Sequence, residues 1–225
     1  MKRIIIAGMV GLTVGIASQV AAKPLKVFIL AGQSNMEGHA AVSTFDHIGM
    51  DPKTAPLLKE MRNADGSPRV CDDVHIAFFT SKGGGEKGPT SLYKQGKLTT
   101  DFGAQGHGPQ IGPEFTFGIY MQKQLNEPIL LIKTAWGGKS LHTDFRSPSG
   151  GPFVWDEKSV DKKSAEDKEK KKAATGHFYH EMIEDVKKVL ADPAMVYPAY
   201  NRSEGCELAG FVWFQGFNDL VASDV

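Results

Sequence analysis

The chain has 225 residues, with 26 Lys and Arg against 26 Asp and Glu, and its formal net charge at pH 7 is zero. This balance gives no electrostatic reason to bind nucleic acid or an anionic membrane, and we expect neither as a partner. The 2 cysteines and 7 histidines have no metal-site spacing, so we expect no zinc site and no cofactor.

Residues 1–22 have the pattern of a secretory signal peptide. A basic start precedes an apolar stretch from Ile4 to about Ala17, and the small residues that follow favour cleavage after Ala22. The stretch is too short to predict a membrane span, although an uncleaved anchor remains the alternative. We expect an exported chain, secreted or periplasmic, whose mature part (residues 23–225) forms one domain.

The two cysteines allow two interpretations. An exported chain can join Cys71 to Cys206 in a disulfide. The sequence does not place them within bonding distance, so two buried free thiols remain the alternative.

Four apolar runs predict strands. They are Lys26–Leu30, Val74–Phe79, Pro128–Ala135 and Leu208–Phe214. Because the runs are continuous rather than alternating, they are typical of parallel strands that are covered on both faces.

Helices fit between these strands. One begins at Gly112-Pro113-Glu114 and runs to about Leu125, and another runs from about His177 to Leu190. Strands that alternate with helices predict an α/β fold in three layers, with a doubly wound, mostly parallel sheet. The charged segment from Asp156 to Lys172 is interpreted as a solvated helix extension or a mobile surface insert.

A pentapeptide, Gly32-Gln33-Ser34-Asn35-Met36, directly follows the first predicted strand. Its serine lies at the carboxyl end of the strand, where open α/β sheets place their ligands. This position suits a nucleophile. The alternative is a polar turn that caps a helix, since Ser and Asn are common there.

Two further segments follow later strands in the same way: Ala135–Ser140, and Gln215–Asp219. In a parallel sheet these ends share one edge, so all three segments can converge on one pocket. Ester hydrolysis needs a nucleophile, a base and donors for the oxyanion. Ser34 can attack, and its own N–H, the N–H of Gly138 and the side-chain amide of Asn218 can donate.

These motifs, taken in order, resemble those of the SGNH (GDSL-like) hydrolase superfamily, and within it the sialate O-acetylesterase and acetylxylan esterase group. The matching segments are Gly32–Met36, Gly112–Glu114, Gly137-Gly138 and Trp213–Gly216. The resemblance covers nearly all of the mature chain. It implies a flavodoxin-like SGNH hydrolase fold and a serine esterase that removes O-acetyl groups from carbohydrate, either sialic acid or a plant or algal polysaccharide, through an acyl-enzyme.

The resemblance also implies roles for individual residues. Ser34 is the expected nucleophile, with Gly138 and Asn218 in the oxyanion hole. Gln215 is a competing donor, because the group often has Gln-Gly-Glu-Ser where this chain has Gln-Gly-Phe-Asn. Gln33 and Gln215 are also expected to contact the sugar. Apart from the resemblance, aromatic and cationic groups suit sugar faces and acidic sugars, so Trp136, Lys139, His142 and Arg146 are expected to line that side of the pocket. Surface placement is the alternative for the last three. Glu114 either starts its helix or holds the nucleophile loop.

The family's general base is a histidine near the carboxyl end, preceded by an aspartate and following a fifth strand. This chain stops at Val225, and the expected Asp–His pair is absent. We therefore expect a sequence that is incomplete at its C-terminus, without the fifth strand and last helix and with Leu208–Phe214 along an open edge. His39, His107 and His142 fall on loops at the active edge, but no pattern links them, or the neighbouring Asp144, to Ser34.

Two other functions are considered. A serine without its base is a weak nucleophile, which makes a catalytically impaired carbohydrate-binding or interaction protein the main alternative. A flavodoxin-like nucleotide or flavin binder shares the sheet order. The segment after the first strand lacks the G-x-G-x-x-G spacing of such proteins.

Overall fold

The computed structural model describes residues 23–81, 90–106, 108–154 and 164–221. The expected signal peptide, His107 and the first part of the charged segment lie outside these ranges. Among the described helices, none combines the length and the apolar character that a membrane span requires.

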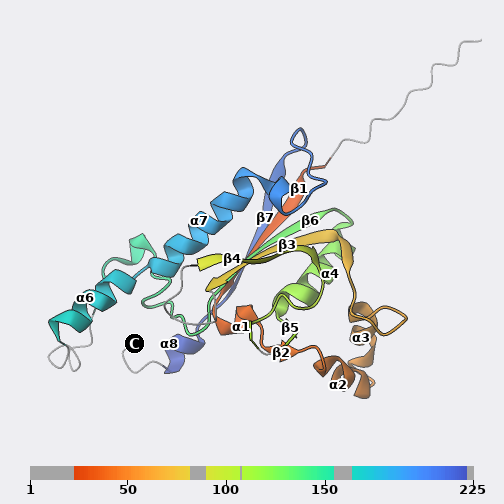
Figure 1. The fold of residues 1–225 in the computed structure, drawn as a ribbon, viewed down its shortest axis with the longest axis horizontal. Coiled ribbons are helices and arrows are strands. Elements are labelled where there is room, and N and C mark those ends of the chain that lie inside the picture. The colour runs from red at the N-terminus through yellow and green to blue at the C-terminus, as the bar shows by residue number, and fades with distance from the viewer. Residues whose placement is uncertain (1–22, 82–89, 107, 155–163, 222–225) are drawn as a thin grey trace, which may run out of the picture.

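The centre of the fold is a five-stranded sheet in the order β4-β3-β6-β1-β7 (Figure 1). The strands are β1 (Leu25–Gly32), β3 (Cys71–Ser81), β4 (Thr90–Leu98), β6 (Ile129–Ala135) and β7 (Cys206–Phe214). β3, β6, β1 and β7 run parallel, and β4 pairs with β3 in the antiparallel direction. The four predicted strands and the mostly parallel sheet are confirmed.

The sequence patterns do not predict β4, which lies between the predicted strand Val74–Phe79 and the predicted helix that begins at Gly112. Leu92 and Leu98 face the two apolar cores, while Gln95 and Lys97 are exposed. An antiparallel strand at a sheet edge can face water, so it needs few apolar residues and leaves no continuous run in the sequence. Other short elements were also not predicted: β2 (Ala40–Ala41), β5 (Gln110–Ile111), α2 (Thr44–Met50) and α3 (Ala55–Met61).

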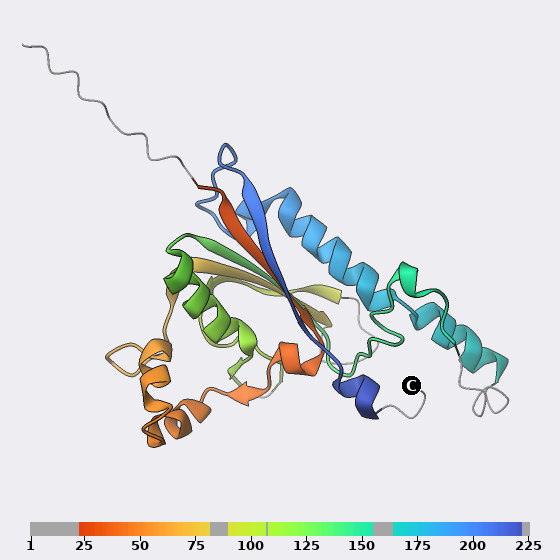
Figure 2. The ribbon, with the colours of Figure 1, turned by 180° about the vertical axis from the view of Figure 1, so that it is seen from behind.

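The sheet lies between two helical layers, with α4 (Pro113–Leu125) on one face and α7 (His177–Ala191) on the other (Figures 1 and 2). Alternate residues of the inner strand β1, which lies between β6 and β7, show the division. Phe28 and Leu30 join the core on the α4 side, and Val27 and Ile29 join the core on the α7 side. The three-layer α/β fold is therefore confirmed, and both helices begin and end within a residue or two of the prediction.

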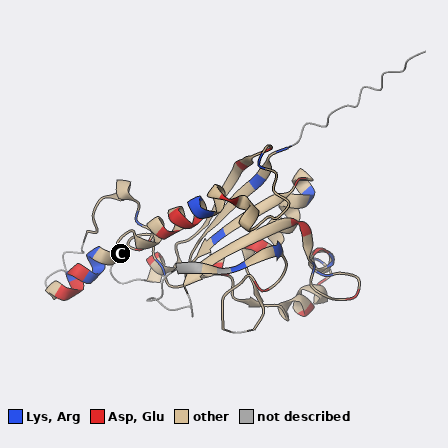
Figure 3. Ribbon diagram, turned by 45° about the horizontal axis from the view of Figure 1, so that its top comes forward, with Lys and Arg blue, Asp and Glu red and all other residues tan. Residues whose placement is uncertain are grey.

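The described part of the charged segment forms α6 (Ala165–Ala174), which has no buried residue. Ser164 caps it, since its hydroxyl accepts from the N–H of Asp167 and the Asp167 side chain accepts from the N–H of Ser164. Figure 3 shows charged residues along α6 and α7, whereas most of the sheet is uncharged. Residues 164–174 are therefore a solvated helix.

Both cysteines are free thiols. Cys71 is buried at the start of β3, and Cys206 is exposed at the start of β7. Two strands, β6 and β1, separate them in the sheet. Since neighbouring strands are about 4.8 Å apart, the cysteines are well beyond the roughly 7 Å that a disulfide can bridge. The disulfide interpretation is wrong, and so is the burial of both thiols.

β7 forms one edge of the described sheet, since it pairs with β1 alone among the described strands. Several of its apolar side chains are exposed, namely Leu208, Phe211, Trp213 and Phe214. An apolar open edge is the arrangement that the sequence predicts for this strand.

Asp185 on α7 gives the fold a pH dependence. Burial, reinforced by Glu181 and Glu184 and partly offset by Lys188, raises the pKa of Asp185 to about 7. Its Oδ2 atom has no hydrogen-bond partner among the described residues. Between about pH 4 and pH 7 the folded chain keeps a proton that the unfolded chain releases, so the free energy of unfolding falls as pH rises through this window.

We predict that Asp185→Asn raises the free energy of unfolding at pH 8 and changes it little at pH 4, because the amide resembles the neutral carboxyl. Each pH unit in the window corresponds to about 1.4 kcal/mol for a fully coupled group, which is an upper bound. Urea unfolding from pH 4 to pH 8 measures the effect. Asp72→Asn is the control, since Lys97 lowers the pKa of Asp72 and its loss should not stabilise the fold at pH 8. Parallel pH profiles for wild type and Asp185→Asn would contradict the prediction.

Candidate active site

The strand register brings three segments to one level of the sheet edge. Gly32, the last residue of β1, pairs with Ala135 at the end of β6 and with Phe214 at the end of β7. Gln33-Ser34, Trp136–Gly138 and Gln215–Asn218 therefore leave the sheet side by side. This convergence is what the parallel arrangement predicts.

Gly32 is required by how closely β1 approaches β7. A Cβ atom at Gly32 would lie 2.2 Å from the carbonyl oxygen of Phe214, which real Cβ contacts never allow. The absence of a side chain therefore keeps the nucleophile segment and the β7 end segment in contact.

Ser34 begins the single-turn helix α1 (Ser34–Glu37). Its hydroxyl donates to Oε1 of Gln33, and its N–H donates to no acceptor among the described residues. Gln33 was expected to contact the sugar, but it is fully buried and its side chain is not open to a ligand. The structure makes Gln33 the hydrogen-bond partner that orients the serine.

The turn after β6 supplies a second free N–H group. Gly138 has φ +72°, a left-handed conformation that favours glycine. Its N–H has no acceptor among the described residues. A Cβ atom on the preceding Gly137 would lie 3.0 Å from Oε2 of Glu37, so the turn rests directly on that buried carboxylate.

The two competing amides after β7 differ in their contacts. Gln215 donates through Nε2 to the carbonyl oxygen of Lys139 at 2.6 Å, so its donor group holds the β6 turn. Asn218, half-buried in α8 (Phe217–Val221), makes no hydrogen bond among the described residues. Gln215 therefore has one of its two amide N–H groups committed to the β6 turn, whereas both amide N–H groups of Asn218 are free to donate to an oxyanion.

Polar contacts fix the loop that follows Gly138. Asp219 of α8 accepts from the N–H groups of Leu141 and His142 at 2.8 and 2.7 Å. The Arg146 guanidinium donates to the carbonyl oxygens of His142, Gly150 and Gly151. These contacts order both walls of a pocket of about 440 Å³, lined by Leu141, His142, Arg146, Ser147, Gly150, Gly216 and Asp219.

Two of the expected sugar contacts lie in the core. Trp136 is 1% exposed, and its ring packs against Phe145 and Phe178 at centroid distances of 5.9 and 5.1 Å. Lys139 is 5% exposed, and its ammonium lies 4.5 Å from the centre of the Phe178 ring. An aromatic or long side chain that follows a strand can be either buried or exposed, and the sequence alone does not distinguish the two.

The described histidines do not contact Ser34. His39 lies 3.7 Å from the Glu37 carboxylate, and the buried His75 packs against Tyr197 in the core. His142 and Asp144 do not pair, because Asp144 accepts from the N–H and hydroxyl of Ser140. Nε2 of His142 is buried without a hydrogen-bond partner.

A buried ion pair beneath α1 was not predicted from the sequence. Nζ of Lys133 lies 2.6 Å from Oε2 of Glu114, and both side chains are fully buried. Burial lowers the pKa of Lys133, and the Glu114 carboxylate opposes this shift. Oε1 of Glu114 also accepts from the N–H of Gly112, so Glu114 both starts α4 and holds the lysine. The one sequence feature that could have indicated this ion pair is a lysine inside the apolar run Ile129–Ala135.

Comparisons with known proteins found a family match and a structural match. Residues 24–224 match the family described as "Carbohydrate esterase, sialic acid-specific acetylesterase". A solved X-ray structure of a protein from Arabidopsis thaliana is similar at 20% sequence identity and a TM-score of 0.41. That match covers 88% of this chain and 60% of the Arabidopsis chain. No curated protein matches the sequence.

We predict that Asp219→Ala speeds hydrogen exchange at the amides of Leu141 and His142. The two N–H groups lose a charged acceptor worth about 1.5–3 kcal/mol, so exchange should accelerate by roughly 10-fold or more. Exchange mass spectrometry of peptides spanning 138–146 measures this. Asp192→Ala, which removes a carboxylate bonded to Arg202, is the control and should leave these peptides unchanged. Unaltered protection in Asp219→Ala would contradict the assignment of Asp219 as the loop's anchor.

Proposed function

The chain belongs to the family of carbohydrate esterases described as sialic acid-specific acetylesterases, and from this premise we propose that it hydrolyses O-acetyl esters of carbohydrate through an acyl-enzyme on Ser34. The observation that carries the proposal is the common level of Gly32, Ala135 and Phe214. It brings the serine, a glycine turn with a free N–H and a free side-chain amide to one edge.

In the proposed reaction, Ser34 Oγ attacks the acetyl carbonyl carbon and negative charge develops on the carbonyl oxygen. The N–H groups of Ser34 and Gly138 and the side-chain amide of Asn218 donate to this oxyanion. One such donor is typically worth about 3 kcal/mol in the transition state. The C–O bond to the sugar then breaks, and the departing oxygen takes up the proton that Ser34 loses, so that the sugar leaves as an alcohol. Water then attacks the acetyl-serine, and the products are acetate, a proton and the restored Ser34 hydroxyl.

In this proposal, the rate is limited by removal of the hydroxyl proton from Ser34. This proton is held by the amide oxygen of Gln33, a neutral acceptor that is not a base near pH 7. The oxyanion hole and substrate binding alone give about 10³–10⁴ over the uncatalysed reaction. Because the hydrogen bond from Ser34 to Gln33 provides no base, it also favours the second candidate function, a carbohydrate-binding protein with impaired catalysis.

The pocket beside the site supports a sugar as the alcohol part of the ester. At about 440 Å³ it falls in the range of small-molecule sites. Arg146 lines it and has no carboxylate partner among the described residues, which favours an acidic sugar. The proposed location of the protein is the periplasm or the medium outside the cell, and this proposal rests on the signal-peptide pattern of residues 1–22.

We predict that the chain hydrolyses an aryl acetate faster than the buffer does and that Ser34→Ala abolishes the difference. The reason is that Ser34 is the proposed nucleophile and the remaining donors cannot form an acyl-enzyme. Steady-state release of the phenol measures the rate. Ser203→Ala, in the exposed turn before β7 at the opposite end of the sheet, is the control and should keep the wild-type rate. Equal rates for wild type and Ser34→Ala would contradict the esterase and favour the binding protein.

We predict that Asn218→Ala lowers kcat by about 10²-fold, the usual effect of removing one oxyanion donor. Gln215→Ala should lower kcat less, by under about tenfold, because its amide holds the Lys139 carbonyl instead. Comparing kcat for the two variants on one aryl acetate measures the difference. A larger loss in Gln215→Ala than in Asn218→Ala would reverse the assignment.

A further inference from the structure

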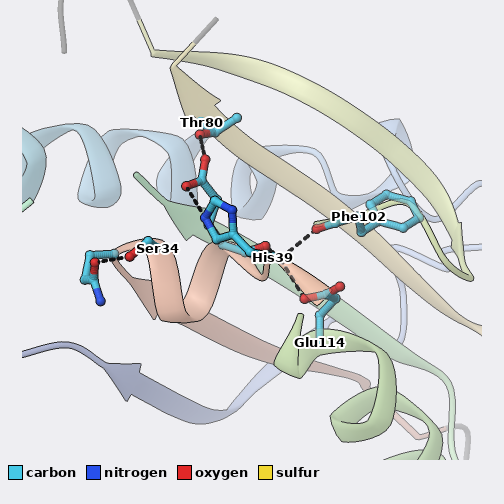
Figure 4. A network of polar contacts seen from close by, with 8 residues as sticks. Ser34, His39, Thr80, Phe102 and Glu114 are labelled. Carbon is cyan, nitrogen blue, oxygen red and sulfur yellow. Dashed lines mark hydrogen bonds and ion pairs between the residues drawn. The ribbon is translucent and has the colours of Figure 1, made fainter. Parts of the chain in front are cut away.

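Lys133 has no exposed surface and makes three hydrogen bonds from one ammonium group. Nζ donates to the carbonyl oxygens of Glu37 at 2.8 Å and Phe102 at 2.6 Å, and to Oε2 of Glu114 at 2.6 Å. A lysine ammonium has three donors, so each one is satisfied. Figure 4 shows Phe102 and Glu114 pointing toward this centre, with Ser34 at the other end of α1.

The three acceptors come from separate parts of the chain. Glu37 is the last residue of α1, Phe102 lies in the loop after β4, and Glu114 lies in the first turn of α4. Lys133 itself comes from β6, the central strand of the sheet. One side chain therefore joins the nucleophile helix to two elements that are remote from it in sequence.

The nucleophile helix needs such support. α1 has four residues, and a helix of one turn is not stable alone in water. The last carbonyl groups of a helix receive no hydrogen bond from within it. In α1, the carbonyl oxygen of Glu37 accepts instead from the Lys133 ammonium. The following residue, Gly38, packs so closely on Gly112 that a Cβ atom would lie 2.1 Å from the Gly112 Cα.

The side chain of Glu37 extends the same support to the oxyanion turn. Its carboxylate is 4% exposed, accepts from Oγ1 of Thr80 at 3.0 Å and lies directly beneath Gly137. A shift of Glu37 therefore moves the base on which the Gly137-Gly138 turn rests.

We propose that Lys133 is a positioning residue that holds the carboxyl end of α1, so that Ser34 and the Gly137-Gly138 turn stay aligned. Lys133 touches neither Ser34 nor the turn, and it acts through Glu37. The kinetic part of the test rests on the proposed esterase function, and the structural part does not.

Stability and positioning can be separated by substitution. Lys133→Met alone leaves the Glu114 carboxylate buried without its cation, which is strongly destabilising. The pair Glu114→Gln with Lys133→Met removes both charges, and such neutral replacements often keep stability. Glu114→Gln also retains an oxygen that can accept from Gly112. In this double variant the Glu37 carbonyl still loses its donor.

The experiment compares wild type, the double variant and Lys26→Met by urea unfolding, by hydrogen exchange of residues 33–38 and by aryl acetate kinetics. Lys26 is the control, since it pairs with Glu207 at the opposite end of the neighbouring strand β1. We expect the double variant to unfold near the wild-type urea midpoint. Exchange at residues 36–38 should be at least tenfold faster, and kcat tenfold or more lower with KM changed less than threefold. Lys26→Met should show neither change.

Wild-type exchange at residues 36–38 in a double variant that is folded would overturn the proposal, as would a wild-type kcat. If the double variant does not fold, the pair Glu114→Met with Lys133→Met replaces it and carries the same expectations. Absence of aryl acetate turnover in wild type would count against the proposed function alone, because the exchange measurement still decides the role of Lys133.

Discussion

A buried positive charge organises the active edge of this protein. The Lys133 ammonium lies between β6 and α4 with no access to water, and a charge in that position must be neutralised and fully hydrogen-bonded. The Glu114 carboxylate provides the neutralisation, and two backbone carbonyls complete the hydrogen bonding. Because those carbonyls belong to the nucleophile helix and to the loop after β4, satisfying the charge also fixes where the two segments lie.

A second constraint is the close approach of backbones at the strand ends. Gly32 lies against the Phe214 carbonyl, and Gly137 lies against the Glu37 carboxylate. The result is an assembled set of donors beside Ser34, with its hydroxyl held by Gln33. The geometry thus orients Ser34, and under the proposed function the free N–H groups at this edge stabilise the oxyanion. Gln33, the observed partner of the Ser34 hydroxyl, is not a base that can remove its proton. Whether Ser34 is deprotonated therefore distinguishes the esterase from the binding protein.

Much of the fold was predictable because its signals are local. The apolar runs that predict β1, β3 and β6 are continuous since these strands are covered on both faces, and Pro113 marks the start of α4. The run of β7 is equally continuous, although several of its apolar side chains are exposed. β4 was missed because this antiparallel edge strand leaves no such run. The positions of Ser34, Gly138 and Asn218 followed from their places after strands. The roles of Gln33, Trp136 and Lys133 did not, since burial and hydrogen-bond partners depend on segments far away in the sequence.

The central claim is that Ser34 is an oriented, reactive nucleophile, and its covalent modification tests this most directly. Wild-type protein is treated with a fluorophosphonate, and the modified peptide is located by mass spectrometry. The account predicts one adduct per chain, on Ser34, and none at that peptide in Ser34→Ala. An unmodified Ser34 after prolonged treatment, or an adduct on another residue, would contradict it.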